Sequence, residues 1–151
     1  MPALTIDSPL GPLTLTEDDG ALTRLSWQGP QGHDNTALLT SAARQLDQYF
    51  QRSLTEFDLP LAPKANATQQ RFLDALLAIP YGETRTYGEM AKRTGLSAQA
   101  AGQACGANPI AIIIPCHRVT GTGNLGGFSA PDGIEKKVEL LKLEGAASLL
   151  I

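Results

Sequence analysis

Residues 112–121 read IIIPCHRVTG, and the interpretation of the whole chain depends on this stretch. The three isoleucines form a β-branched apolar run that Pro115 ends, which predicts a buried strand over 112–114. One of the two cysteines of the chain, Cys116, and one of its two histidines, His117, follow at once. Cys116 is therefore either a small apolar residue that fills the core or a nucleophile at the mouth of a pocket.

The chemistry of a cysteine nucleophile sets requirements for its neighbours. Cysteine attacks as the thiolate, and a nearby imidazole or helix end lowers its pKa. Adjacent strand residues point to opposite faces, so a bond between Cys116 and His117 requires a turn of the chain or a bridging water. Glu144 is one of several carboxylates that could orient the histidine. Both interpretations of Cys116 stay open on these grounds, because most free cysteines are packing residues.

The composition is that of an ordinary globular protein. The chain has 151 residues, 42% hydrophobic and 18% charged, enough for one compact domain or two small lobes. It has no apolar run that could span a bilayer and no signal peptide, which predicts a soluble, intracellular protein with no membrane partner. Two cysteines and two distant histidines match neither a disulfide framework nor a zinc module, so we expect no metal.

The charge is distributed unevenly along the chain. Residues 1–63 carry three arginines against eight acidic residues, a net charge of −5. Residues 64–151 carry nine basic residues against seven acidic ones, a net charge of +2. Any contact with phosphate is therefore expected in the second part, where the field is modest.

The first part is predicted to form strands followed by a helix. Residues 3–7 and 12–27 alternate apolar and polar positions around the turn EDDG, the pattern of a β-hairpin. Residues 36–52 place apolar side chains on one face of a helix. A segment near residues 58 to 67, rich in proline and small residues, is predicted to be a linker.

The second part is predicted to contain a helix-turn-helix. Thr86 and Glu89 form a capping box at the start of a short helix that Gly95 ends. Ser97 then caps a second helix over 98–107. This second helix consists mostly of alanine and glycine. Such residues allow close helix packing, and they would equally let the helix enter the minor groove of DNA, about 6 Å wide.

Two further helices are expected around this pair. Thr68 can cap a helix over 69–79, which Pro80 ends. A last helix begins after Asp132. Its side chains expected to face inward are Ile134, Val138 and Leu141.

Several motifs closely resemble one family, the O6-alkylguanine-DNA alkyltransferases, which are methylated-DNA–protein-cysteine methyltransferases. The motifs are PCHRV at 115–119, GANPIAIII at 106–114, LGGFS at 125–129, LLKLEG at 140–145 and IPYGETRTYGEMAKRTG at 79–95. The resemblance is strong over about residues 66–147 and loose over the strand-rich first part. It favours the nucleophilic interpretation of Cys116.

The resemblance implies a mixed α/β (α+β) fold. Residues 1–63 would form a small ribonuclease-H-like lobe with an antiparallel sheet. Residues 64–151 would form a winged-helix-like lobe with the helix-turn-helix and the active cysteine. Members of the family bind duplex DNA through the minor groove and flip the damaged guanine into a pocket. The resemblance further implies a monomer that needs no cofactor and has double-stranded DNA containing O6-alkylguanine as its partner.

It also implies roles for particular residues. Cys116 would accept the alkyl group, while His117, acting through a water and oriented by Glu144, would remove the thiol proton. Asn108 would hydrogen-bond in the hinge between the recognition helix and the active strand. Tyr87 would donate to the flipped base, so that guanine leaves as a neutral species. The residues expected to contact the base are Tyr87, Val119, Phe128 and Ser129. Those expected to contact DNA are Ser97, Ala98, Gln99, Ala100, Gly102 and Arg118.

The chain departs from the family pattern at several positions. Gln99 stands where members usually carry an arginine that fills the gap in the base stack, which predicts weaker binding to DNA. Phe128 replaces the usual tyrosine of the pocket wall. Cys105 occupies a position that is commonly apolar, and we expect a small, buried and inert thiol there. Arg118 and Lys137 align with basic positions of the family, and for both residues surface or interface ion pairing is as compatible with the sequence as a role in the chemistry.

Three functions are compared on this basis. The leading hypothesis is irreversible, single-turnover transfer of an alkyl group to Cys116 from O6-alkylguanine, with O4-methylthymine as a second candidate substrate. The alternative is an alkyltransferase-like protein that binds lesions and flags them without repair; such proteins usually lack the acceptor cysteine, which is present here. A cysteine hydrolase is disfavoured, because the second histidine, His33, lies in a Gly-rich loop of the first lobe.

Overall fold

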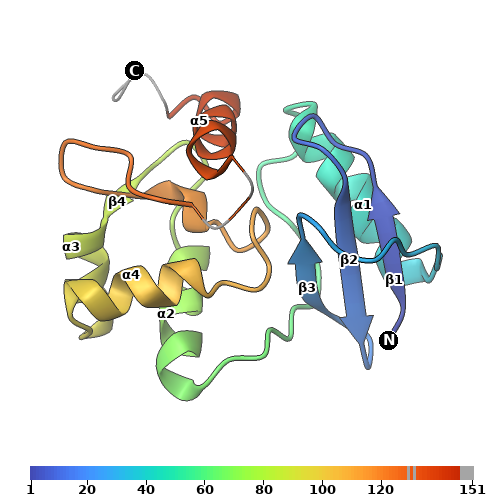
Figure 1. The fold of residues 1–151 in the computed structure, drawn as a ribbon, viewed down its shortest axis with the longest axis horizontal. Helices are drawn as coiled ribbons and strands as arrows, with labels where there is room; N and C mark the ends of the chain where they lie inside the picture. Colours follow the sequence, from blue (N-terminus) through green and yellow to red (C-terminus); the bar gives the residue numbers. More distant parts are fainter. Residues whose placement is uncertain (129, 131, 147–151) are drawn as a thin grey trace. The chain divides into compact units, whose positions relative to one another are not determined.

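The chain folds into two compact units, one over Met1–Lys64 and the other over Ala65–Ile151. The structure is a computed structural model, and it describes residues 1–128, 130 and 132–146. The first unit contains a three-stranded sheet and one helix, and the second contains the other helices (Figure 1), so the fold is mixed α/β as predicted. Within the described residues, no helix is both long enough and apolar enough to cross a membrane.

The first unit is an antiparallel sheet with one helix packed on it. The strands β1 (Ala3–Ile6), β2 (Leu13–Asp18) and β3 (Ala21–Ser26) lie in this order, and the helix α1 (Ala37–Phe50) contacts β1 and β2. The predicted turn between β2 and β3 is confirmed, since Asp19 and Gly20 both have a positive φ, as tight hairpin turns require. The buried leucines of the sheet and the helix are Leu13, Leu15, Leu22, Leu25, Leu39 and Leu46.

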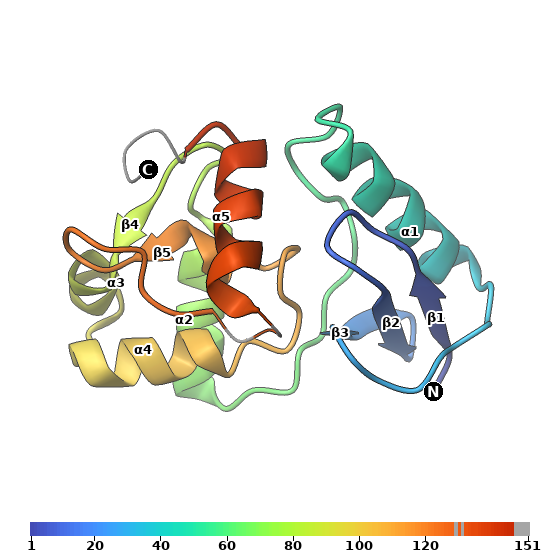
Figure 2. The same ribbon diagram turned by 45° about the horizontal axis from the view of Figure 1, so that its top comes forward.

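In the second unit, the helices α2 (Ala67–Leu77), α3 (Tyr87–Thr94) and α4 (Ala98–Gly106) pack against one another. The 3-10 turn η1 (Cys116–Arg118) leads into the short strand β5 (Val119–Thr120), and the helix α5 (Gly133–Leu143) is the last element of the described residues. β5 pairs in parallel with β4 (Arg85–Thr86), which directly precedes α3 (Figure 2). This pairing brings the first residue of α3, Tyr87, close to the segment that follows η1.

The helix-turn-helix prediction is confirmed in its capping details. Thr86 accepts a hydrogen bond from the backbone N–H of Glu89, whose carboxylate accepts one from the N–H of Thr86. Gly95 ends α3 with a φ of 75°, in the left-handed region that favours glycine. Ser97 caps α4 through the N–H of Ala100. Local side-chain chemistry therefore fixes the ends of both helices.

The strand predicted over 112–114 is not present. These three isoleucines are buried, but they lie in turns, and Ile112 has a φ of 73°. The side chain of Asn108 holds the loop closed: it donates to the carbonyl of Ile114 and accepts from the N–H of Ile110. With Pro115 at the end of the segment and the carbonyl of Ile114 bound by Asn108, the three isoleucines fill the core outside any strand.

Two expectations for the flanking helices also need correction. α2 begins earlier than predicted, because Asn66 and not Thr68 caps it. In α5, Ile134 is 56% exposed and does not face the core. The buried face of this segment consists of Lys137, Leu140, Leu141 and Glu144, spaced i, i+3, i+4 and i+7. A pattern search that counts only apolar residues misses this buried face, because a lysine and a glutamate stand at its two ends.

Candidate functional site

Cys116 is the first residue of η1 and is only 5% exposed. In a 3-10 turn, successive side chains point about 120° apart, so three consecutive residues can reach three different surroundings. The turn therefore gives Cys116, His117 and Arg118 separate environments. In the strand that the isoleucine run predicts, alternate residues would instead share a face.

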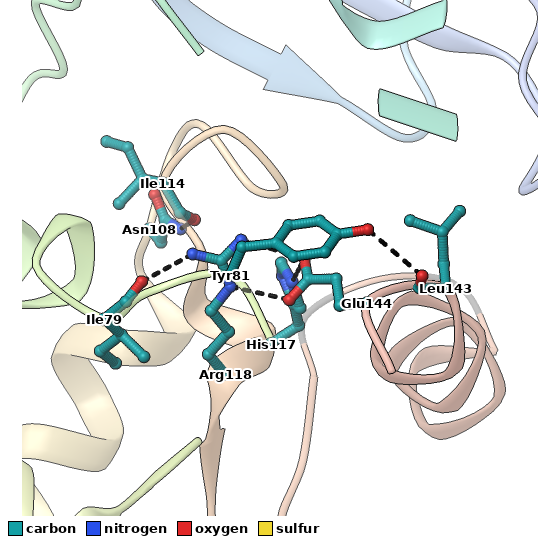
Figure 3. Close-up of polar contacts among 8 residues, drawn as sticks. All are labelled: Ile79, Tyr81, Asn108, Ile114, His117, Arg118, Leu143 and Glu144. Carbon is teal, nitrogen blue, oxygen red and sulfur yellow. Dashed lines mark hydrogen bonds and ion pairs between the residues drawn. The ribbon is translucent and has the colours of Figure 1, made fainter. Parts of the chain in front are cut away.

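The two residues that follow Cys116, His117 and Arg118, form a buried polar group with Glu144 (Figure 3). His117 Nε2 lies 2.7 Å from Glu144 Oε2. Arg118 binds the same carboxylate in a bidentate manner, with Nε 2.8 Å from Oε1 and Nη2 3.1 Å from Oε2. A third Arg118 nitrogen, Nη1, donates to the carbonyl of Ile79 at 2.7 Å. The predicted pairing of His117 with Glu144 is thus present in the structure, and Arg118 completes the group.

The electrostatics of this group determine which atom of the histidine carries the proton. Burial alone would raise the pKa of Glu144, but its hydrogen bonds to His117 and Arg118 and the positive charge of Arg118 lower it to about 2. Burial lowers the pKa of His117, and the opposing effect of Glu144 does not overcome it. At neutral pH, a carboxylate therefore faces a neutral imidazole, and Nε2 must be the donor. Nδ1 of His117 is then an acceptor, and it has no hydrogen-bond partner among the described residues.

The pKa of the Cys116 thiol is lowered from its ordinary value. The largest cause is a hydrogen bond from the thiol of Cys105, which outweighs the effect of burial, and Asn108 and the positive charge of Lys137 act in the same direction. Asn108 thus lies at the site as the resemblance implied, although it closes a loop and not a hinge to a strand. The surroundings favour a thiolate at Cys116.

Cys116 opens onto a cavity of about 320 Å³. The residues that line this cavity are Tyr87, Gly102, Cys105, Gly106, Cys116, Gly127 and Phe128. Glycines from α4 and from the loop before α5 leave the space open, while Tyr87 and Phe128 provide aromatic surface. A flat aromatic ligand that reaches the sulfur would meet both aromatic rings and polar groups of the lining.

Tyr87 is held in the cavity by its neighbours. Burial and the nearby thiols raise the pKa of its hydroxyl, so the phenol stays protonated and can donate a hydrogen bond. Gly126, with a φ of 71°, packs directly against the ring: an added Cβ would lie 2.8 Å from Cε2 of Tyr87. The ammonium of Lys137 lies 6.0 Å from the centre of the same ring.

Lys137 is buried, and the sequence did not predict this placement. Its Nζ donates to the carbonyls of Val119 at 2.7 Å and Gly127 at 2.9 Å. These bonds join α5 to the strand after η1 and to the cavity wall. The available signal was its spacing from Leu140, Leu141 and Glu144 in α5.

The remaining residues expected at the base are placed as follows. Phe128 lines the cavity and is half-buried. Val119 is buried, and its carbonyl is occupied by Lys137. Ser129 lies outside the described residues. Of the described residues expected at the base, Tyr87 and Phe128 therefore lie in the cavity wall.

The residues expected to contact DNA divide into two groups. Ser97, Ala98 and Gln99 are exposed at the start of α4, and Ala100 and Gly102 are partly buried further along it. Arg118 does not lie with them, and its expected contact with DNA needs correction. It is 7% exposed, and each of its three guanidinium nitrogens donates a hydrogen bond to Glu144 or Ile79. The carboxylate of Glu144 holds the guanidinium of Arg118 inside the protein, whereas this positive charge was expected to face phosphate.

Comparison with known families and proteins accounts for both units. The model for the ribonuclease-like domain of 6-O-methylguanine DNA methyltransferase matches residues 3–63, and the model for its DNA binding domain matches residues 67–146. The fold and the site thus define a class of proteins in which a ribonuclease-like domain precedes a DNA-binding domain with a buried cysteine. Within this class, the chain belongs to the 6-O-methylguanine DNA methyltransferase family.

Relatives match along almost the full chain. A methylated-DNA–protein-cysteine methyltransferase of Mycobacterium tuberculosis is 47% identical over 150 residues, covering 93% of this chain and 90% of its own. One of Methanosarcina acetivorans is 42% identical over 151 residues, with coverages of 93% and 96%. The crystal structure of Mycobacterium tuberculosis OGT in complex with DNA superposes with a TM-score of 0.86 at 44% identity, covering 97% of this chain and 94% of that chain.

Proposed function

We propose that this protein repairs DNA by transferring the alkyl group of O6-alkylguanine directly and irreversibly to Cys116. The observation that carries the proposal is that Cys116 lines a cavity and is followed directly in the same turn by His117, which is paired with Glu144. The Mycobacterium tuberculosis relative named above bears the name of this activity, and its structural counterpart is a complex with DNA.

The chemistry follows from the polar groups around the sulfur. The thiol proton of Cys116 passes through a water to Nδ1 of His117, while Glu144 stabilises the imidazolium that forms. The thiolate attacks the alkyl carbon, a new S–C bond forms, and the bond between this carbon and O6 breaks. The electron pair remains on the guanine, which takes up a proton as it leaves. The Tyr87 hydroxyl in the cavity wall is the donor proposed for this step.

Access to the alkylated base requires that it leave the duplex. An atom inside the base stack is out of reach of a sulfur in a cavity, so the base must rotate out of the duplex. We propose that α4 contacts the minor groove through its exposed residues Ser97, Ala98 and Gln99. Gly102 of the same helix lines the cavity, which supports entry of the base alongside α4. The protein would act inside the cell, as a monomer and without a cofactor.

The proposal is tested by the mass of the protein after incubation with an oligonucleotide duplex containing O6-methylguanine. The expected result is a gain of about 14 Da, the mass of one CH₂, on the peptide that contains Cys116. A thioether does not release its methyl group, so the yield should stop at one methyl per chain even with excess DNA. Cys116→Ala should lose the transfer and keep the binding of the duplex.

The alternative function, binding and flagging of lesions without repair, predicts a different result. The mass would then stay unchanged with excess methylated duplex, although the duplex is bound. The intact Cys116 with a lowered pKa favours transfer over this alternative.

A further inference from the structure

We propose that Cys105 is a positioning residue for alkyl transfer, whose thiol donates a hydrogen bond to the thiolate of Cys116. This inference rests on the proposed function, because it assigns Cys105 to the same reaction. This role differs from the small, buried and inert thiol that the sequence predicts at this position.

The geometry places the two cysteines side by side. Cys105 lies in the last turn of α4, is 8% exposed, and lines the same cavity as Cys116. Its Sγ lies 3.6 Å from the carbonyl oxygen of Cys116, to which its S–H donates. The S–H can rotate about the Cβ–Sγ bond, so when Cys116 loses its proton the same donor can turn toward the negative sulfur.

The charges decide which of the two thiols ionises. The pKa of Cys116 is lowered by hydrogen bonds from Cys105 and Asn108 and by the charge of Lys137. The pKa of Cys105 is raised well above its ordinary value by the hydrogen bond to Cys116 and by burial. Two adjacent thiolates in a buried site would repel each other, so one proton is retained and shared. Cys116 carries the charge because hydrogen bonds from Asn108 and from the backbone of Cys116 act on it and not on Cys105. Cys105 therefore remains a protonated donor.

A hydrogen bond of this kind has a measurable consequence. A donor to the thiolate stabilises the charged form, so its removal should raise the pKa of Cys116. Each unit of increase lowers the thiolate fraction tenfold at a pH below the pKa. We therefore expect removal of the Cys105 thiol to slow the reaction of Cys116 about threefold or more under these conditions.

The experiment measures the rate of alkylation of Cys116 by iodoacetamide as a function of pH. The variants are Cys105→Ala and Cys105→Val, which remove the donor, and Cys105→Ser, which keeps one. In each variant Cys116 is the single remaining cysteine, so the labelling reports this thiol alone. In the wild type, peptide mapping separates the two thiols. Valine, unlike alanine, leaves no cavity at this position, so this variant carries the test if the smaller alanine unfolds the helix.

The expected result is a midpoint shifted to higher pH in Cys105→Ala and Cys105→Val, with Cys105→Ser close to the wild type. A purely structural role would change the rate at all pH values and leave the midpoint in place. Midpoints equal to the wild type in both apolar variants would overturn the proposal.

The same proteins separate this inference from the proposed function. Iodoacetamide needs no DNA, so the titration tests the hydrogen bond independently of repair. Single-turnover transfer from the methylated duplex is then measured at the same pH values. A shifted midpoint without any methyl uptake by the wild type would support the hydrogen bond and contradict the proposed function.

Discussion

Glu144 is the residue on which the buried polar group depends. Its two oxygens are shared between His117 and Arg118, and all three residues are almost fully buried. Removal of one partner from a buried ion pair leaves the other charge without compensation, which costs far more than the loss of a surface pair. The same carboxylate therefore contributes to stability and holds the imidazole in the tautomer that can accept a proton.

We predict that acid destabilises the second unit through Glu144. Its pKa falls from an ordinary value of 4.5 to about 2 on folding, so the unfolded chain binds more protons than the folded one between these values. The stabilisation is complete above about pH 4.5 and is lost as the pH falls toward 2, a difference of about 3 kcal/mol. Urea unfolding followed by circular dichroism at pH 7, 4 and 3 measures it. Glu144→Gln should be less stable at pH 7 and should have a flatter acid profile.

Glu83→Gln is the matched control for this prediction. Glu83 also pairs with an arginine, Arg85 at 3.1 Å, but its side chain is 53% exposed. An exposed pair contributes about 0 to 1 kcal/mol, so this variant should keep both the stability and the acid profile of the wild type. Equal effects of the two substitutions would contradict the role assigned to burial.

At the scale of elements, the site depends on the loop between β5 and α5 as much as on the helices. This loop supplies Gly127 and Phe128 to the cavity wall, and Lys137 of α5 binds its backbone at Gly127. Gly126 supports the ring of Tyr87, which belongs to α3. Gly126 thus lets the loop pack closely against the start of α3.

We predict that Gly126→Ala slows alkyl transfer by displacing Tyr87. An alanine Cβ would lie 2.8 Å from Cε2 and 3.0 Å from the hydroxyl oxygen, so the ring must move. Gly123→Ala is the control: its φ of 73° is nearly the same, but an added Cβ meets no atom within 4 Å. Both variants carry the cost of a positive φ, about 1–2 kcal/mol. Single-turnover rates on a methylated duplex should fall several-fold for Gly126→Ala alone, and equal rates for the two variants would exclude this role for Gly126.

Elements with local signals could be predicted from the sequence, and those formed by distant contacts could not. Thr86, Gly95 and Ser97 act on backbone groups within four residues, so their effect can be recognised in the sequence. The loop around Ile112 is held by Asn108 and by burial, and its apolar run is equally typical of a strand. The buried position of Lys137 depends on two carbonyls that only the fold brings near.

At the scale of the whole molecule, the two units differ in charge. The acidic residues outnumber the basic ones in the first unit, and the second has only a small positive excess. The exposed start of α4 consists of Ser97, Ala98 and Gln99, none of which is basic. Affinity for DNA therefore depends on few cations, and one more on α4 should have a clear effect.

We predict that Gln99→Arg strengthens binding to duplex DNA and makes it more dependent on salt. One additional phosphate contact should steepen the slope of log K against log salt by about 0.9. Fluorescence anisotropy with a labelled duplex at several salt concentrations measures this slope. Gln51→Arg is the control, because Gln51 is an exposed glutamine of the first unit and its substitution changes the net charge equally. An equal change in both variants would indicate an effect of net charge and not of α4.

The candidate site could be predicted from the sequence only where residues are adjacent or match a motif. Cys116 and His117 are neighbours in the chain, and the motif resemblance connects them with Glu144. The burial of Arg118 could not be predicted, because it depends on Glu144 and Ile79 approaching from opposite ends of the second unit. The adjacency of the two thiols likewise results from α4 and η1 meeting in space.

The single 3-10 turn η1 makes the site sensitive to chain length. Its three side chains face different surroundings because the spacing between Pro115 and Val119 sets the direction of each of them around the turn. Insertion or deletion of one residue between these positions would rotate the following side chains by about 120°. The sulfur, the imidazole and the guanidinium would then exchange places while every amino acid of the site was retained. In evolution, this segment can therefore accept replacements far more readily than a shift in spacing.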